Sequence, residues 1–242
     1  MLIRSTELSS EMRKAALVPA LFFLAGFGPQ GASIVPQDDT QTIFGPQNIV
    51  VNNAVIPAFD TASTPVLNTS TAVATTTLST TQSGDLVVFL VNDNGGTCST
   101  PTDTAGLVWT ARTTPADWCE FWAYASAPLS SDVITSNLSF GISSTVAIAV
   151  KGPTAPTPFD SNASLPAENA TTAIYSTSDP PSFVFCMWNY AGGPTPAQCP
   201  GFTAMASGAY IAIGYQIYSV SQSGVSVTPG TGTNSVFVDV LK

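Results

Sequence analysis

Two series of β-type segments follow each other along the chain in the same order, and this pattern constrains the fold more than any other feature. The first series consists of DLVVFLV (85–91), LVWTART (107–113), EFWAYASA (120–127), VITSNLSF (133–140) and TVAIAVKG (145–152). The second consists of SFVFCMWNY (182–190), GFTAMAS (201–207), YIAIGYQIYS (210–219), GVSVTPG (224–230) and SVFVDVLK (235–242). Runs rich in β-branched and aromatic residues between turn-rich segments indicate strands. A repeat of about 90 residues is too long for a solenoid unit. We therefore expect two sheets packed face to face.

The predicted fold is all-β: a jelly-roll-like β-sandwich of two internally repeated halves. We place a signal peptide or retained hydrophobic segment at 1–32, an extended arm at 33–60 and the sandwich at 61–242, with halves at about 83–152 and 180–242. Aromatic side chains are expected to pack in the core or at its rim. They are Trp109, Phe121, Tyr124, Trp188, Tyr215 and Tyr218. An exposed aromatic platform that stacks on sugars stays an alternative.

The N-terminal residues show the order of an export signal. Basic residues at 13 and 14 precede fourteen mostly apolar positions, AALVPALFFLAGFG (15–28). A bilayer span takes about 20 apolar residues, so no stable membrane span is expected. A retained interfacial or buried helix is the alternative. A pilin-type signal cut near Lys14 is disfavoured by Pro19 and by the short apolar run.

The arm contains an apolar stretch of strand character, NIVVNNAVIPAFD (48–60). It has two interpretations: it pairs with the sheet of its own chain, or it adds a strand to the open edge of a neighbouring subunit. The residues predicted to form such a donor strand are Asn48, Ile49, Val50, Val51, Val55 and Ile56. The Thr-rich segment TSTAVATTTLSTT (69–81) suits an edge strand.

Composition excludes several functions. Only 9% of the residues are charged, against a norm of about 25%, and the net charge is −9. Binding to phosphate backbones needs clustered Lys and Arg, so no nucleic-acid partner is expected. The chain has no histidine, which removes the usual general base and imidazole metal ligands. We therefore predict that the protein is not an enzyme.

Four cysteines fit an oxidising compartment and two disulfides: Cys98, Cys119, Cys186 and Cys199. Three pairings exist, and proximity in sequence favours 98 with 119 and 186 with 199. Four N-glycosylation sequons begin at Asn68, Asn137, Asn162 and Asn169. In a chain with 58 Ser and Thr residues, sequons also arise by chance.

The loop NDNGGTC (92–98) and the segment after it hold Asp93, Asn94 and Asp103 as candidate calcium ligands. Calcium takes six to eight oxygen ligands, and this stretch lacks the spacing of an EF-hand loop. The same residues are typical of an ordinary turn. No other cofactor is expected. A glycosidase would need paired carboxylates facing a cleft. Asp117 and Glu120 are near in sequence but are expected to be solvated loop residues.

The chain resembles a large group of secreted β-sandwich domains, jelly-roll or immunoglobulin-like, from bacteria, archaea and their viruses. The resemblance rests on SGDLVVFLV, DTAGLVWTART, FWAYASAPLSSDVIT and SVFVDVLK, and covers about residues 60 to 242. Most members have no assigned function, and these motifs carry no catalytic residues over. The organisation is similar to that of donor-strand filament subunits.

The resulting hypothesis is an extracellular structural subunit of a cell-surface or virion assembly, with other copies of the chain as partners and glycans attached. A filament built by strand donation is the specific form of this hypothesis. The alternative is a carbohydrate-binding or receptor-binding β-sandwich module.

Overall fold

The computed structural model describes residues 55–69, 72–93, 96–112, 117–139, 143–153, 155–190, 199–229 and 232–242. Contacts along the chain separate Met1–Val50 from a compact unit, Val51–Lys242, to which all of these residues belong. Every regular element among them is a β-strand, so the all-β prediction is confirmed.

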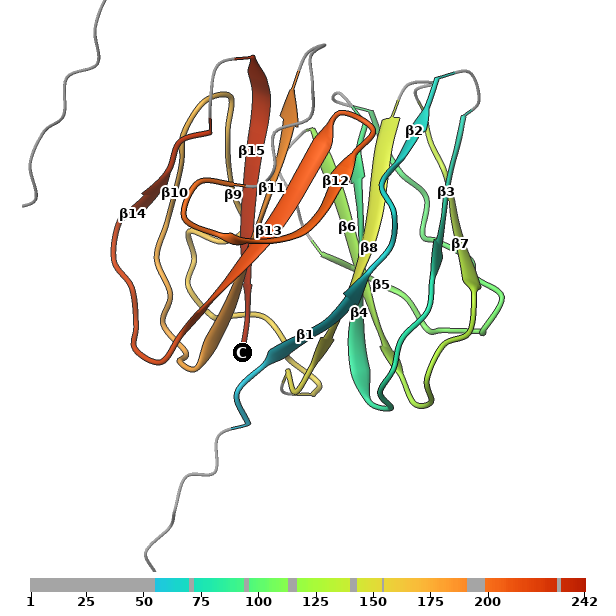
Figure 1. The fold of residues 1–242 in the computed structure, drawn as a ribbon, viewed down its shortest axis with the longest axis horizontal. Helices are drawn as coiled ribbons and strands as arrows, with labels where there is room; N and C mark the ends of the chain where they lie inside the picture. Colours follow the sequence, from blue (N-terminus) through green and yellow to red (C-terminus); the bar gives the residue numbers. More distant parts are fainter. Residues whose placement is uncertain are drawn as a thin grey trace, which may run out of the picture. The chain divides into compact units, whose positions relative to one another are not determined.

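Two large antiparallel sheets form the centre of this unit (Figure 1). The six-stranded sheet has the order β1-β8-β4-β6-β5, and β2 also pairs with β8. Its strands are β1 (Ala58–Ala62), β2 (Val66–Asn68), β4 (Asp85–Asn92), β5 (Thr110–Arg112), β6 (Trp118–Ala125) and β8 (Ser143–Lys151). The five-stranded sheet has the order β12-β13-β11-β15-β9. Its strands are β9 (Ala167–Asn169), β11 (Ser182–Tyr190), β12 (Thr203–Gly208), β13 (Ile211–Tyr218) and β15 (Thr233–Leu241).

Each large sheet carries a small two-stranded sheet on its outer face (Figure 1). β3 (Val73–Leu78) pairs with β7 (Asp132–Asn137) beside the six-stranded sheet, and β10 (Ala173–Tyr175) pairs with β14 (Val225–Val227) beside the five-stranded sheet. The unit therefore has four layers. We call β1 to β8 the first half and β9 to β15 the second half.

Three hydrophobic clusters fill the spaces between these layers. The middle cluster lies between the two large sheets, and each outer cluster lies between a large sheet and its small partner. In β4, Leu86, Val88 and Leu90 belong to the middle cluster, while the alternate residues point to the outer one. Because side chains alternate between the faces of a strand, a strand covered on both faces must be apolar throughout. This explains why DLVVFLV and SFVFCMWNY are nearly continuous apolar runs.

The two large sheets have corresponding strand orders. Read from one edge, the first begins β5-β6-β4-β8 and the second begins β12-β13-β11-β15. β7 is missing from the first order and β14 from the second, and each of these two strands belongs to the small outer sheet of its half. The side-chain amide of Asn189 donates a hydrogen bond to the side-chain oxygen of Asn92, so the ends of the central strands β11 and β4 touch each other.

Several sequence expectations need correction in detail. Of the described residues 107–112, only 110–112 form a strand, β5, because Leu107 and Trp109 belong to a turn that Asp103 organises. The short strands β2, β9 and β10 were not expected. Of the segment 48–60, residues 48–54 lie outside the described residues. Its end forms β1, which pairs with β8 of its own sheet.

Candidate functional site

The loop after β4 places Asp93 in an unusual environment. Its carboxyl group is buried and has no hydrogen-bond partner among the described residues, and this burial raises its pKa to about 6. Gly96 lies directly against the Asp93 carboxylate, and Ser139 lies beside it. A side chain at position 96 would collide with that carboxylate, so the loop can close over Asp93 only because residue 96 is glycine.

Asp103 accepts several hydrogen bonds from the turn in which it lies. Its Oδ1 accepts hydrogen bonds from the backbone N–H groups of Gly106 (2.6 Å) and Leu107 (3.0 Å), and its Oδ2 accepts one from Trp109 Nε1 (2.7 Å). These bonds organise the turn that leads into β5. Asn94 lies outside the described residues. Within the described ranges no three acidic, cysteine or histidine side chains converge. The calcium site therefore stays a prediction without a ligand set.

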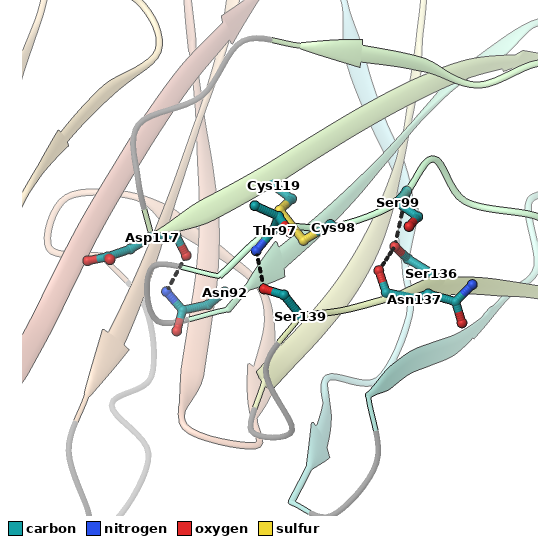
Figure 2. Close-up of a disulfide and its surroundings, with 9 residues drawn as sticks. All are labelled: Asn92, Thr97, Cys98, Ser99, Asp117, Cys119, Ser136, Asn137 and Ser139. Carbon is teal, nitrogen blue, oxygen red and sulfur yellow. Dashed lines mark hydrogen bonds between the residues drawn. A yellow bond between two sulfur atoms is a disulfide. The ribbon is translucent and has the colours of Figure 1, made fainter.

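The first disulfide joins Cys98 of this loop to Cys119 of β6, with an S–S distance of 2.05 Å (Figure 2). The loop is also fixed to the residues around β7: the backbone N–H of Thr97 donates to Ser139 Oγ at 2.6 Å, and Ser136 Oγ donates to the Ser99 carbonyl at 2.6 Å. The loop is a disulfide-tethered connection, as the sequence predicted.

The second disulfide joins Cys186 of β11 to Cys199. The pairing of all four cysteines is the one that proximity in sequence favoured. Both sulfurs of the second bridge belong to residues fully buried in the outer cluster of the second half, whereas Cys98 and Cys119 are half-buried.

The four sequons differ in accessibility. Asn137 and Asn169 are exposed, whereas Asn68 and Asn162 are half-buried. The side-chain amide of Asn68 donates to the Val73 carbonyl (2.7 Å), and that of Asn162 donates to Ser178 Oγ (3.0 Å). A glycan attaches to this amide nitrogen, so both sites would have to rearrange. Glycosylation stays a prediction, and the geometry favours Asn137 and Asn169.

The tryptophans do not form the open platform that sugar stacking would need. Trp118 is buried in the middle cluster, where its Nε1 donates to Ser235 Oγ at 2.7 Å. Trp188 is buried in the outer cluster of the second half. Trp122 is half-buried and contacts the edges of Tyr124 and Phe159. The predicted core packing is therefore confirmed for Trp188, and Trp118 is a further buried tryptophan.

A cluster of three ionisable side chains was not predicted from the sequence. Arg112 of β5, Glu120 of β6 and Asp239 of β15 meet in the space between the two large sheets. Arg112 binds Asp239 through both Nε and Nη2, the latter at 3.0 Å from Oδ1. Its Nε lies 3.8 Å from Glu120 Oε2, and its guanidinium lies 4.0 Å from the ring centre of Phe159.

Both carboxyl groups of this cluster are fully buried. One cation faces two acids, and its bidentate geometry neutralises Asp239. Burial, and next the negative charge of Asp239, raise the pKa of Glu120 well above its usual value, while Arg112 lowers it by a smaller amount. The buried environment of Glu120 therefore favours the protonated, uncharged form of its carboxyl group.

Two cavities lie on either side of Arg112. One of about 360 Å³ is lined by Glu120, Trp118 and the Cys98 loop. The other, of about 500 Å³, is lined by Trp122, Phe159 and Pro158. Acid–base chemistry needs carboxyl groups that a substrate can reach. Glu120 and Asp239 have no exposed side-chain surface, so the arrangement acts chemically as an internal ion cluster that joins the two halves.

The prediction that Glu120 is a solvated loop residue was wrong. Trp118, Glu120 and Trp122 alternate along β6 and so share the face that points to the opposite sheet. The available signal was that alternation, together with Arg112 as the only arginine after residue 13.

No protein-family model, curated protein or solved structure matches this chain. Within the part of the chain that the structure describes, no helix is long and apolar enough to cross a membrane.

Proposed function

We propose that the protein is an extracellular structural subunit of a cell-surface or virion assembly, and that its N-terminal arm adds a strand to a neighbouring copy. The observation that carries this proposal is the entry of the chain into β1. Val55 and Ile56 are 64% and 60% exposed, although they are apolar and adjacent. They continue an apolar stretch that begins at residue 48. An exposed apolar segment directly before an edge strand is suited to β-augmentation.

Two further features support an assembly protein of the extracellular space. Both disulfides are formed within the described residues, which fits an oxidising compartment. The ionisable cluster joins the two halves, and its two carboxyl groups are closed to solvent, as suits a scaffold. Export by the signal at 1–32 and glycosylation at Asn137 and Asn169 belong to the same proposal.

The sandwich itself is, in this proposal, a jelly-roll-like duplication. Corresponding strand orders support it, as does the Asn92–Asn189 contact between equivalent ends of the two central strands. Such a contact between equal positions is typical of a two-fold related pair.

Imaging of the secreted protein tests the assembly. The full chain is expected to form polymers in electron micrographs, and a variant lacking residues 33–54 but retaining β1 is expected to be monomeric. A matched control replaces residues 33–47 with an equally long Gly-Ser segment, retains 48–56, and should still polymerise. Equal thermal unfolding of the three proteins shows that the sandwich is intact. Polymers that persist without residues 33–54 contradict the proposal.

The second candidate is a carbohydrate-binding module. The observation in its favour is the cavity of about 500 Å³ that Trp122, Phe159 and Arg112 line together. A sugar that stacks there would perturb the fluorescence of Trp122. A glycan titration that gives no change in the wild type, or the same change in Trp122→Ala, rejects this candidate.

A further inference from the structure

We propose that the strand donated by a neighbouring copy pairs with the open edge of β12, and that the donated strand is residues 48–54 of that copy. This inference rests on the proposed function, because it names the acceptor for the assembly described there. Four observations support it: the nature of the β12 edge, the apolar seam beside it, the absence of charge in the two segments that would pair, and the path by which the chain enters β1.

The first observation is the edge itself. β12 lies at the end of the five-stranded sheet and pairs on one side with β13; no other described strand pairs with it. At six residues it is the longest edge strand of the two large sheets, since β1 has five and β5 and β9 have three each. Its sequence, TAMASG, contains none of the charged residues or prolines that usually protect an edge from pairing.

β12 does carry one natural safeguard, a bulge between Ala204 and Ala206. A bulge bends an edge and so prevents the flat edge of another sheet from docking along it. A single strand can follow the bend. The edge is therefore better suited to one donated segment than to the pairing of two whole sheets.

The second observation is a seam of apolar side chains at the same border of the sandwich. Met205 and Ala206 of β12, Phe59 of β1 and Tyr215 of β13 are only partly buried where they pack against the middle cluster. The rings of Phe59 and Tyr215 stack with their centroids 5.4 Å apart, which places the edge of one large sheet beside that of the other. A strand added outside β12 would lay alternate side chains over this seam and bury it.

The third observation concerns the occupant. Residues 40–59 contain no charged side chain, and neither do residues 199–218 around β12, so the two segments can pair without burying a charge. In a strand, Ile49 and Val51 point to the same face. That face can supply the apolar side chains that the seam lacks.

The path into β1 explains why the occupant is a second copy. Ala58 pairs with Lys151 at the end of β8, and Val55 lies against Gly152, the residue that follows. The chain therefore enters along the six-stranded sheet, beside β8, and does not cross to β12 on the other sheet. The described chain thus begins beside the end of β8, away from the outer side of β12, and the proposed occupant of that edge is residues 48–54 of a second copy.

Cysteine cross-linking tests this pairing. All four native cysteines are bonded, so an added cysteine is the only free thiol. Val51→Cys protein is co-secreted with Ala204→Cys protein and oxidised mildly. A matched control replaces the second partner with Thr110→Cys, an exposed position on β5 at the opposite edge of the other sheet. We expect covalent dimers at least about tenfold more abundant with Ala204→Cys than with Thr110→Cys.

Two further variants complete the test. The double variant Val51→Cys/Ala204→Cys should form cross-linked multimers; a monomer closed by an internal disulfide overturns the assignment to a second copy. Thr203→Lys/Ser207→Lys should reduce the polymer yield by at least about tenfold, whereas Thr110→Lys should not. Equal cross-linking at positions 110 and 204 overturns the assignment to β12.

The outcomes separate the two proposals. Polymers that need residues 33–54 but show no cross-link at position 204 contradict the β12 assignment and leave the proposed function standing. Polymers that form without residues 33–54 contradict the proposed function itself.

Discussion

The two large sheets have a glutamate and an isoleucine at corresponding positions. Glu120 of β6 pairs with Leu90 on the central strand of the first sheet, and Ile213 of β13 pairs with Met187 on the central strand of the second. Both side chains point into the space between the sheets. Ile213 packs there with other apolar residues, whereas Glu120 requires Arg112 and Asp239 beside it. The comparison shows that this position in the sheet can hold either an apolar or an ionisable side chain. Only the ionisable side chain depends on several other residues at once.

Removing the cation should have the largest effect. In Arg112→Ala, Asp239 remains buried without its counter-charge, which typically destabilises a protein by about 3–5 kcal/mol. Urea unfolding monitored by tryptophan fluorescence measures the change. Lys242→Ala is the control. A loss of less than about 1 kcal/mol in Arg112→Ala would show that the cluster is not a buried ion network.

The disulfides extend the comparison of the halves, because the bridge of the first half is half-buried and that of the second is fully buried. Paired Cys→Ala substitutions should each cost about 3 kcal/mol, since both bridges close loops of similar length. Mild reduction followed by alkylation and peptide mapping should open Cys98–Cys119 first. Earlier labelling of Cys186 would contradict the burial of the second bridge.

Glu120 can ionise and Ile213 cannot, so the pH dependence of stability tests the difference between these two positions. Burial raises the pKa of Glu120 above its unfolded value of 4.5. It also raises the pKa values of Asp85 and Asp93 to about 6. A raised folded pKa means that the stabilisation is fully present below the unfolded pKa and is lost as the pH rises through the folded one. Thermal unfolding should therefore occur at a higher temperature at about pH 5 than at about pH 8.

The substitution Glu120→Gln keeps the size of the side chain and cannot ionise. It should flatten this pH dependence, because burial raises the pKa of the wild-type carboxyl group and an amide has no proton to lose. Asp93→Asn is the matched variant for the region between about pH 4 and pH 6. A wild-type protein that gains stability steadily from pH 5 to pH 8 would contradict the raised pKa of Glu120.

The smallest effect is expected at the C-terminal ion pair. Lys242 Nζ lies 3.1 Å from Asp179 Oδ2, and both side chains are partly exposed. Solvent screens such pairs, so Lys242→Ala should change the unfolding free energy by at most about 1 kcal/mol. The same urea experiment measures it. A loss comparable to that of Arg112→Ala would remove the distinction between the buried cluster and the surface pair.

The sequence predicted strands best where both faces are covered. DLVVFLV and SFVFCMWNY are central strands because nearly every residue in them is apolar, and a strand between two layers needs that composition. The short strands β2, β9 and β10 have three residues each, too few for a period of two to be recognised. The structure has four layers, whereas the sequence predicted only two facing sheets.

Some of the candidate site residues could be predicted from the sequence, and others could not. Both cysteine pairs were favoured correctly because nearness in sequence limits the partners that a cysteine can reach. Asp103 was assigned to calcium although it organises a turn, since an acidic loop residue has the same appearance in either role. Asn94 and the donor residues Asn48, Ile49, Val50 and Val51 lie outside the described residues, so those assignments remain predictions.

The sequence by itself determined the strand-rich architecture, the two series of segments and the cysteine pairing, because each follows from local periodicity or from short separation along the chain. Tertiary structure alone decided that Glu120 is buried and that Arg112 meets Asp239, 127 positions further on. Contacts of that kind depend on how the sheets are stacked, and neither residue carries a local signal of its distant partner. The same holds for the open edge of β12, since an edge is defined by the absence of a neighbour in space.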